Sequence, residues 1–501
     1  MSVKSKLAEI VAGRVVRKIS KDSRNAVELQ EDIFRTLIQS AENTSFGKDH
    51  RFSDIINHKE YTSSVQIRDY EQLFPYIDRW KNGEHNVLWK GLPKYFCKTS
   101  GTTSGTKYIP LTNDSLPNHI NSARNALLYY IHETRQSDFV NGKMIFLQGS
   151  PQLDKLPSGI PYGRLSGIVA NHVPAYLQKN RLPSYQTNSI DDWETKVQAV
   201  VGETMHQDMS LISGIPNWVQ MYFEILLKRS GKNSISELFP KFSLFVYGGV
   251  NFDPYRRKFD ELIGKRIPTI ETYPASEGFI AFQDSQDKEG LLLNINSGIF
   301  FEFIPADDYF NASPRRLTLK DVKVGVNYAI ILTSNAGLWS YSIGDTVRFV
   351  SLDPPRIKVT GRIKHYTSAF GEHVIAEEVE KAMANACEAL GLNITEFHVA
   401  PMVNPDAGLP YHEWFIESEK YPADVRLFSE LIDNKMQEQN VYYRDLVKGH
   451  VLQPAIIRFV KPGSFNNYMK SEGKLGGQNK VPRLANDRKI ADFLSVEIIH
   501  R

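Results

Sequence analysis

Hydrophobic residues recur with helical spacing over the first ninety residues of the chain. The clearest pattern covers residues 26–41, AVELQEDIFRTLIQSA. The same period of three to four residues links four apolar positions near the start of the chain, Leu7, Ile10, Val11 and Val15. Because residues at this spacing share one face of a helix, the sequence predicts an N-terminal helical region.

Strand-like and helical patterns alternate further along the chain. Short β-branched or aromatic runs that end in turn residues occupy residues 143–149, 242–249 and 266–273. Helix-like segments at residues 190–205 and 216–230 lie between or beside these runs. Such alternation is typical of α/β layers, in which ligands gather at the ends of the strands.

From about residue 291 the pattern changes to successive strands. Four runs carry it, residues 298–305, 327–334, 346–351 and 356–361. They predict an antiparallel sheet or a β-barrel-like part that belongs to the same large N-terminal α/β region.

A different pattern follows residue 361. A helix is predicted at residues 376–391, because Val379, Met383, Ala386 and Leu390 share one face. Two strand-like runs, a second helix and a further strand come after it, which is typical of a compact α+β domain. The predicted division is therefore a large domain at 1–360, a hinge at 361–364 and a smaller α+β lid domain at 365–501.

Composition narrows the protein classes. A chain of 501 residues is too long for one core, and 41% hydrophobic with 23% charged residues is typical of a globular protein. The net charge of +3, without a long block of one sign, argues against a nucleic-acid-binding surface. Two cysteines, Cys97 and Cys387, are too few for a disulfide framework or a cysteine zinc site.

No targeting or membrane segment is recognisable. The N-terminus lacks the apolar core of a signal peptide, and no apolar run reaches ~18 residues. We therefore expect a cytoplasmic protein without a membrane partner, and we expect it to be a monomer.

The chemistry is concentrated in residues 97–112, CKTSGTTSGTKYIPLT, in which nine of sixteen residues are Gly, Ser or Thr. Such a stretch is either a solvent-exposed turn or a phosphate-binding loop, whose backbone N–H groups and hydroxyls converge on oxygens. It is not a Walker loop, because only three residues separate Gly101 from Gly105, where the motif needs four, and Tyr108 follows Lys107. The G-x-G-x-x-G fingerprint of dinucleotide-binding folds is absent as well.

The loop resembles the phosphate loop of the adenylate-forming ligase superfamily, through Ser100-Gly101-Thr102-Thr103 and Lys107. Three further stretches resemble that superfamily and follow in its order, FVYGGVNFDP with ETYPASEG, GLWSYSIGDTVRF, and GRIKHYTSAFGEHVIAEEVE.

The closer resemblance is to the auxin-responsive Gretchen Hagen family of acyl-acid amido synthetases. The segments TSFGKDHRF, VQIRDYEQLFPYIDRW, LISGIPNW and GGQNKVPRL carry it, and it extends over residues 45–485. Several other segments are similar to bacterial members.

The resemblance implies roles for individual residues around ATP. The phosphates would be cradled by Thr99, Ser100, Gly101, Thr102 and Thr103, with Lys107 near the outgoing pyrophosphate. The adenine would lie against Gly248, Gly249, Tyr273, Ala275 and Ser276. The ribose would be held by Asp345, with Arg362 in reach of the ribose or the phosphates.

Glu277 would hold Mg²⁺ between the phosphates, because this hard cation binds carboxylate oxygen. Each of these residues also has a purely structural interpretation. Glu277 would then cap a helix after Ser276, Asp345 would belong to a turn after Gly344, and Lys107 would be a solvated lysine.

A lysine from the lid would assist adenylation, and two candidates stand in SEGKLGGQNKVPRL, Lys474 and Lys480. The sequence departs from the family at two positions. The family usually has Tyr-Arg before the Gly-Asp region, whereas this chain has Tyr341-Ser342. Plant members have Asp-Lys where this chain has Glu372-His373.

The predicted function is ATP-dependent ligation of a small carboxylic acid to an amino acid through an acyl-adenylate, with ATP and Mg²⁺ as cofactors. Two alternatives stay open, an acyl-coenzyme A ligase and a nucleotide-binding protein without ligase activity. No zinc-hydrolase or serine-esterase motif is present. Cys97 has no recognisable partner histidine, which indicates a buried small residue.

Overall fold

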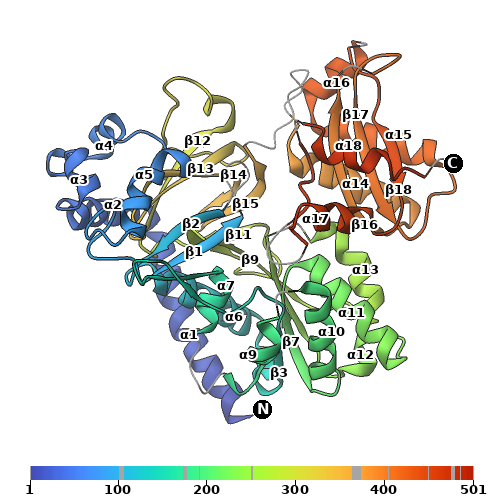
Figure 1. Cartoon of the computed structure of the whole chain (residues 1–501), viewed down its shortest axis with the longest axis horizontal. Coiled ribbons are helices and arrows are strands. Elements are labelled where there is room, and N and C mark those ends of the chain that lie inside the picture. Colours follow the sequence, from blue (N-terminus) through green and yellow to red (C-terminus); the bar gives the residue numbers. More distant parts are fainter. Residues whose placement is uncertain are drawn as a thin grey trace. The chain divides into compact units, whose positions relative to one another are not determined.

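The computed structural model describes most of the chain. The described residues are 2–100, 106–172, 178–190, 192–249, 252–363, 374–403, 405–449, 451–475, 480–485 and 487–499. They form two compact units (Figure 1). The first contains Met1–Gly249 and Gly264–Lys358, and the second contains Val250–Ile263 and Val359–Arg501.

The first unit begins with the helical region that the periodicity predicts. Its helices are α1 (Val3–Arg24), α2 (Ala26–Ala41), α3 (Ser45–Asp49), α4 (His58–Ser64) and α5 (Tyr70–Lys81). Polar side chains cap the N-termini of α1 and α5: the Ser2 hydroxyl caps α1, and Asp69 forms a capping box with Gln72 at α5. These caps fix where α1 and α5 begin.

An eleven-stranded sheet crosses the first unit in the order β12-β13-β14-β15-β11-β10-β9-β8-β7-β3-β6. Its parallel part is β6 (Arg181–Leu182), β3 (Lys143–Phe146), β7 (Met209–Ser213), β8 (Leu244–Gly248) and β9 (Thr269–Ala275). The other strands are β10 (Gly278–Phe282), β11 (Leu291–Leu293), β12 (Ile299–Pro305), β13 (Asn327–Ser334), β14 (Leu338–Leu352) and β15 (Pro355–Arg362). The pairs β10–β11, β11–β15, β12–β13 and β13–β14 are antiparallel.

The predicted α/β class is confirmed, and the β-rich part extends the parallel sheet as expected from its pattern. In the described residues, however, the strand order runs from β12 to β6 without closing into a barrel. Helix α6 (Leu116–Thr134) packs on β9 and β10, and α1 packs on α6 (Figure 1). Further helices of this unit are α7 (Leu165–Ala170), α9 (Tyr185–Asn188), α10 (Trp193–Thr204), α11 (Pro216–Ser230) and α12 (Ile235–Leu238).

A smaller sheet has the order β2-β1-β5-β4. Its strands are β1 (Tyr95–Ser100), β2 (Thr106–Leu111), β4 (Asp154–Lys155) and β5 (Pro161–Gly163). β1 and β2 pair antiparallel with Thr99 opposite Lys107, so the hydroxyl-rich sequence connects two strands of one hairpin. The composition of residues 97–112 predicts a loop, so the strands on either side of it are a finding of the structure.

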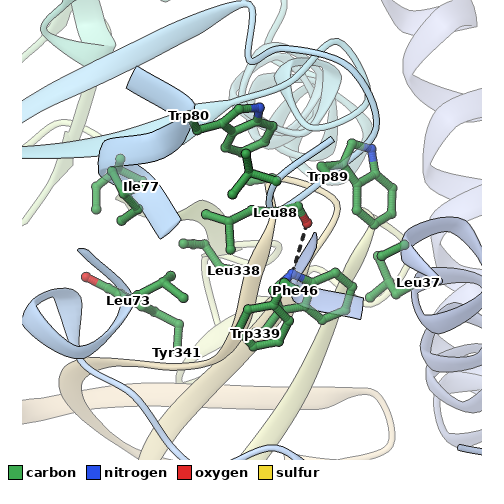
Figure 2. Close-up of a cluster of buried hydrophobic side chains, with 14 of the residues drawn as sticks. Leu37, Phe46, Leu73, Ile77, Trp80, Leu88, Trp89, Leu338, Trp339 and Tyr341 are labelled. Atoms are coloured by element: carbon green, nitrogen blue, oxygen red, sulfur yellow. Dashed lines mark hydrogen bonds between the residues drawn. The ribbon is translucent and has the colours of Figure 1, made fainter. Parts of the chain in front are cut away.

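A buried aromatic cluster supports the start of β14 (Figure 2). The ring of Trp339 stacks on Phe46 with centroids 5.9 Å apart, and its indole N–H donates to the Leu88 carbonyl over 3.0 Å. Tyr341 belongs to the same cluster and is 1% exposed. This packing fixes the strand immediately before Ser342.

The second unit is built on the three-stranded sheet β16-β17-β18. Its elements are β16 (Ile394–Met402), β17 (Tyr411–Ser418), β18 (Ile456–Val460), α13 (Asp253–Ile263), α14 (Ala376–Leu390), α15 (Val425–Gln439), α16 (Val441–Lys448), α17 (Ser464–Ser471) and α18 (Lys489–Ser495). Paired strands with helices agree with the α+β pattern. The hinge at 361–364 stays a prediction.

Helix α13 belongs to this unit although it precedes the predicted boundary by about a hundred residues. Arg483 donates to the Tyr255 hydroxyl over 2.6 Å, and Lys258 forms an ion pair with Glu419 at 2.9 Å. The Asn393 amide donates to Glu261 over 2.7 Å. These long-range contacts are invisible in the local pattern of the sequence.

Among the residues that the structure describes, no helix combines the length and the apolar character needed to cross a lipid bilayer.

Candidate active site

The predicted adenine-binding glycines end strand β8, next to β9. Gly248 pairs with Thr272, and a Cβ at Gly248 would lie 2.5 Å from the Thr272 carbonyl oxygen. Gly249 has φ +84, a backbone conformation that side-chain-bearing residues rarely adopt. Both positions therefore require glycine for backbone reasons, independently of any ligand.

Two predicted nucleotide contacts meet directly. The hydroxyl of Tyr273 on β9 donates to Oδ2 of Asp345 on β14 over 2.7 Å. Tyr273 is 7% exposed and Asp345 is half-buried. Asp345 follows Gly344, whose φ is +82. The hydrogen bond fixes one carboxylate oxygen of Asp345, so this acid has a defined orientation at the predicted ribose position.

Glu277 lies in a hairpin turn. Ala275 of β9 pairs with Gly278 of β10, so Ser276 and Glu277 are the two residues of the connecting turn. The interpretation of Glu277 as a helix cap is therefore wrong. The carboxylate is close enough to Cys97 on β1 to act on its titration: burial first, and then the charge of Glu277, raise the pKa of the Cys97 thiol well above its usual range.

The Cys97 environment also decides the role of this cysteine. Its side chain is fully buried, and a thiol with such a raised pKa is a poor nucleophile. Because Cys97 is on the strand that leads into the hydroxyl-rich loop, its electrostatic contact with Glu277 brings the predicted metal ligand near the predicted phosphate loop.

The phosphate loop itself is described only at its ends. Thr99 lies opposite Lys107 on β2 and Ser100 ends β1, while Gly101, Thr102 and Thr103 lie outside the described residues. The Lys107 ammonium lies 5.5 Å from the ring centroid of Tyr70. The Tyr70 hydroxyl also accepts a hydrogen bond from the backbone N–H of Tyr108 over 2.9 Å.

The first departure from the family pattern has a local solution. The Ser342 and Tyr309 hydroxyls share a hydrogen bond of 2.7 Å, and Ser342 is 7% exposed. Burial raises the pKa of Tyr309, the hydrogen bond from Ser342 opposing it. The polar group that replaces the usual arginine is thus satisfied inside the protein. The second departure, at Glu372-His373, lies outside the described residues.

The remaining predicted residues belong to the second unit. Arg362 ends β15 and is exposed. Lys474 is 44% exposed at its side chain and lies 3.5 Å from Glu472, which also pairs with Lys489 at 2.7 Å. Lys480 is half-buried.

Lys480 is three residues from a buried anchor. Arg483 forms an ion pair with Glu396, lies 3.7 Å from Glu380 and donates to the Phe397 carbonyl. Its backbone carbonyl accepts from the N–H of Val399 over 2.9 Å. Lys480 therefore stands on a segment fixed by buried charge, unlike Lys474.

Two residues that support this site carry no signal in the sequence. Asn118 on α6 is 7% exposed and binds both backbone groups of Phe279, accepting from its N–H over 2.7 Å and donating to its carbonyl over 3.2 Å. This clamp fixes β10 two residues after Glu277. Tyr70 supports β2 in the same way, and both contacts depend on the tertiary fold.

Family models cover most of the chain. The GH3 family N-terminal domain matches residues 15–198, the central domain residues 292–362 and the C-terminal domain residues 377–489. The chain belongs to the GH3 family. This confirms the family resemblance carried by the sequence motifs.

Relatives of the GH3 chain are amido synthetases. Indole-3-acetic acid-amido synthetase GH3.3 of Arabidopsis thaliana is 21% identical, over 97% of this chain and 94% of the relative. Jasmonoyl–L-amino acid synthetase JAR4 of Nicotiana attenuata is 21% identical, over 94% and 93%. The predicted enzyme class, an acid–amino acid ligase that acts through an adenylate, is confirmed at the level of the family.

Solved structures share the fold. AtGH3.15 acyl acid amido synthetase in complex with 2,4-DB has a TM-score of 0.80 at 17% identity, covering 98% of this chain and 96% of that one. A 2-hydroxyisobutyryl-CoA ligase in the postadenylation state has a TM-score of 0.60 at 14% identity, covering 93% and 90%. The GH3 chain thus has the adenylate-forming ligase fold, and ATP use follows from its family.

Proposed function

We propose that this GH3 protein activates a small carboxylic acid with ATP and transfers the acyl group from the adenylate to an amino acid. A carboxylate is a poor acyl donor until its oxygen attacks the α-phosphorus and pyrophosphate leaves. AMP is then the leaving group when the amine attacks the carbonyl carbon. Such chemistry depends on positioning and on stabilising negative charge.

The hydrogen bond between Tyr273 and Asp345 carries this assignment. It fixes one predicted adenine contact, on β9, relative to the predicted ribose acceptor, on β14 of the same sheet. Gly248 and Gly249 would let the purine approach the backbone, and Ala275 and Ser276 would follow Tyr273 along its edge. Asp345 would accept hydrogen bonds from the ribose hydroxyls.

The phosphate end of ATP would lie between the β1–β2 hairpin and the β9–β10 turn. Thr99, Ser100 and the residues up to Thr103 would donate to phosphate oxygens, and Lys107 would face the departing pyrophosphate. Arg362, at the end of β15, would contribute to binding the ribose or the phosphates.

The residues near this end suit a magnesium ion that binds mainly to the nucleotide. No group of three or more His, Cys, Asp or Glu residues able to hold a metal occurs in the described part of the chain. One carboxylate, Glu277, is sufficient because Mg²⁺ usually keeps waters and substrate phosphates as its other ligands. When bound, the ion would neutralise phosphate charge.

Carboxylate-dependent exchange of labelled pyrophosphate into ATP tests the first half-reaction. We expect exchange with members of a broad carboxylic acid panel, and we expect Glu277→Ala to abolish it. Exchange that survives in Glu277→Ala would contradict the metal assignment. Normal ATP binding without exchange for any acid would instead favour a nucleotide-binding protein.

The lysine assignment has its own test. We propose Lys480, because its segment is anchored through Arg483 whereas Lys474 is exposed and paired with Glu472. Lys480→Ala should slow exchange strongly while ATP affinity falls much less, since a transition-state contact affects rate. Lys474→Ala is the matched control, and a larger effect there would reverse the assignment.

The acceptor is tested with preformed adenylate. A mixture of amino acids and coenzyme A is offered, and the products are identified by mass spectrometry. We expect an amide, formed faster as pH rises because the attacking amine must lose a proton. Acyl-coenzyme A as the dominant product would establish the alternative ligase.

A further inference from the structure

Helix α1 presents an apolar stripe to solvent. The stripe consists of four residues with exposed fractions of 85, 61, 55 and 38%, namely Val3, Leu7, Ile10 and Val11. Their spacing places them on one helix face. The opposite face is buried where α1 packs against α6 (Figure 1), through Ser5, Ala12 and Val16. The stripe is therefore additional to the face that holds the helix in the fold.

Positive charge surrounds the apolar stripe. Seven exposed basic residues belong to the same helix, Lys4, Lys6, Arg14, Arg17, Lys18, Lys21 and Arg24. With its two acidic residues the helix has a net charge of +5, whereas the whole chain carries +3. The positive charge of this protein is thus concentrated in its first helix.

Both acidic residues of α1 are engaged with other parts of the first unit. Glu9 accepts a hydrogen bond from the Ser137 hydroxyl over 2.9 Å. Asp22 accepts one from the Asn296 amide over 3.1 Å. Their two negative charges are already counted in the net charge of +5.

The helix dipole does not account for the lysines at the start of α1. The first turn has no acidic residue, although negative side chains are the ones that stabilise a helix N-terminus. The turn is held instead by Ser2, whose hydroxyl accepts from the Ser5 N–H and donates to Asn141 over 2.7 Å. Lys4 and Lys6 thus stand on a fixed, outward-facing turn.

We propose that α1 docks the protein onto the surface of an anionic lipid membrane. The apolar stripe would enter the boundary between headgroups and acyl chains, and the flanking lysines and arginines would bind lipid phosphates. The helix would lie in the plane of the surface. This goes beyond the ligase reaction and replaces the expectation of no membrane partner.

The side chains favour lipid over other occupants. A second copy of the same face would bring two helices of charge +5 together, which is unfavourable. Protein interfaces are enriched in aromatic residues and depleted in lysine, whereas α1 contains lysines and no aromatic residue. Aliphatic residues flanked by long cations suit headgroups, because the stems of lysine and arginine cover apolar surface while their charges remain hydrated.

Vesicle co-sedimentation of the full chain tests the proposal. Vesicles of phosphatidylcholine alone are compared with vesicles that also contain phosphatidylglycerol. We expect binding only to the anionic vesicles, weakened by salt. Leu7→Glu/Ile10→Glu should reduce it to the level seen with neutral vesicles, and Lys4→Gln/Lys6→Gln should weaken it ~10-fold.

Two control variants carry the same kinds of substitution outside α1. Ile56→Glu/Val324→Glu alters two exposed apolar residues elsewhere in the first unit, 76% and 55% exposed, and should bind like the wild type. Lys232→Gln/Lys265→Gln removes two exposed lysines outside α1 and should also have no effect. Unchanged thermal unfolding and pyrophosphate exchange in the α1 variants would show that the fold and the active site are intact.

Three results would overturn the proposal. The first is absence of binding to anionic vesicles at low salt. The second is equal vesicle binding by the wild type and Leu7→Glu/Ile10→Glu, which would show that charge alone acts. The third is a concentration-dependent dimer in sedimentation velocity that Leu7→Glu/Ile10→Glu dissociates, without vesicle binding, which would make the stripe an interface between two copies.

Discussion

The Tyr273 hydroxyl joins two strands that are distant in sequence, because its acceptor, Asp345, is 72 residues away. Tyr273→Phe removes this hydrogen bond and leaves the ring in place. We expect ATP affinity to fall about fivefold, since one hydrogen bond contributes ~1 kcal/mol. Isothermal titration calorimetry measures it. Tyr247→Phe is the matched control in the neighbouring strand, where the hydroxyl lies 3.4 Å from Glu271. Equal losses in both variants would contradict a specific role for Tyr273.

Substitution of Gly248 should destabilise the fold even when no ligand is bound. In Gly248→Ala the new Cβ would meet the Thr272 backbone carbonyl at 2.5 Å, which the paired strands cannot avoid without moving. We expect unfolding free energy to fall by about 1–3 kcal/mol, as for overpacked sites. Gly202→Ala in α10 is the control, because its Cβ would meet nothing closer than 3.6 Å and alanine favours helix. Urea unfolding compares the two variants, and equal free energies of unfolding would contradict a steric clash at Gly248.

At the residue scale, the sequence predicts which residues belong to the site better than it predicts their hydrogen-bond partners. Glu277, Tyr273 and Asp345 could be singled out because their motifs specify residue types. The hydrogen bonds of Asn118 and Tyr309 could not, because each partner is more than thirty residues away and depends on how the elements pack. The helix-cap interpretation of Glu277 was wrong for the same reason: whether a turn precedes a helix or a strand is decided by pairing.

At the element scale, a buried ion pair joins β12 to the segment between β12 and β13, and this segment also contacts β14. Glu302 of β12 is fully buried, and its Oε1 and Oε2 accept from Nε and Nη2 of Arg316, each over 2.8 Å. His58 Nε2 also lies 2.8 Å from Oε1. Arg316 also donates to Ser340, whose φ is +46. This network holds β14 in an irregular conformation ahead of Asp345.

The ion pair makes stability depend on acid pH. Burial alone would raise the pKa of Glu302, but Arg316 and the hydrogen bond from His58 lower it to about 2, from an ordinary 4.5. Ionised Glu302 therefore stabilises the fold above pH 4.5, and this contribution is lost as pH falls toward 2. In urea unfolding across this range, wild type should exceed Glu302→Gln at neutral pH, with the difference shrinking on acidification. A difference independent of pH would contradict the assignment.

Breaking one side of the pair should cost more than removing both. Arg316→Met leaves a buried carboxylate without its cation, and we expect a loss of about 3–5 kcal/mol. Glu302→Met/Arg316→Met removes both charges and should lose much less. Equal losses in the single and double variants, measured by urea unfolding at neutral pH, would show that packing rather than charge is responsible.

Strand and helix prediction succeeded where the hydrophobic period is strong. Residues 26–41 and 327–334 have the expected bounds. β14 is much longer than the predicted 346–351, because Ser342 and Gly344 interrupt the hydrophobic pattern and yet belong to the strand, in which Ser342 pairs with Ile331. β1 and β2 were missed since a run rich in Gly, Ser and Thr indicates a turn, although its two ends form a hairpin.

At the scale of the whole molecule, the division of the chain is not continuous in sequence. A pattern-based boundary near residue 360 cannot assign α13 to the second unit, because the contacts that hold it come from residues 393, 419 and 483. The connection from β8 into α13 and back to β9 is therefore made by covalent links between units that have separate cores. The sequence predicts the type of the elements whose hydrophobic period is strong, and long-range contacts decide which elements unfold together.

This assignment predicts that α13 unfolds with the second unit. In hydrogen exchange of the full chain, Ile416→Val weakens the core of the second unit by about 0.5–1.5 kcal/mol, and Ile212→Val weakens β7 of the first unit by a similar amount. Both isoleucines are fully buried, so the substitutions are matched. We expect the amides of α13 to exchange faster in Ile416→Val and to be unaffected in Ile212→Val, because cooperative units open together. The reverse pattern would assign α13 to the first unit and leave its bonds to Glu419 and Arg483 as minor surface contacts.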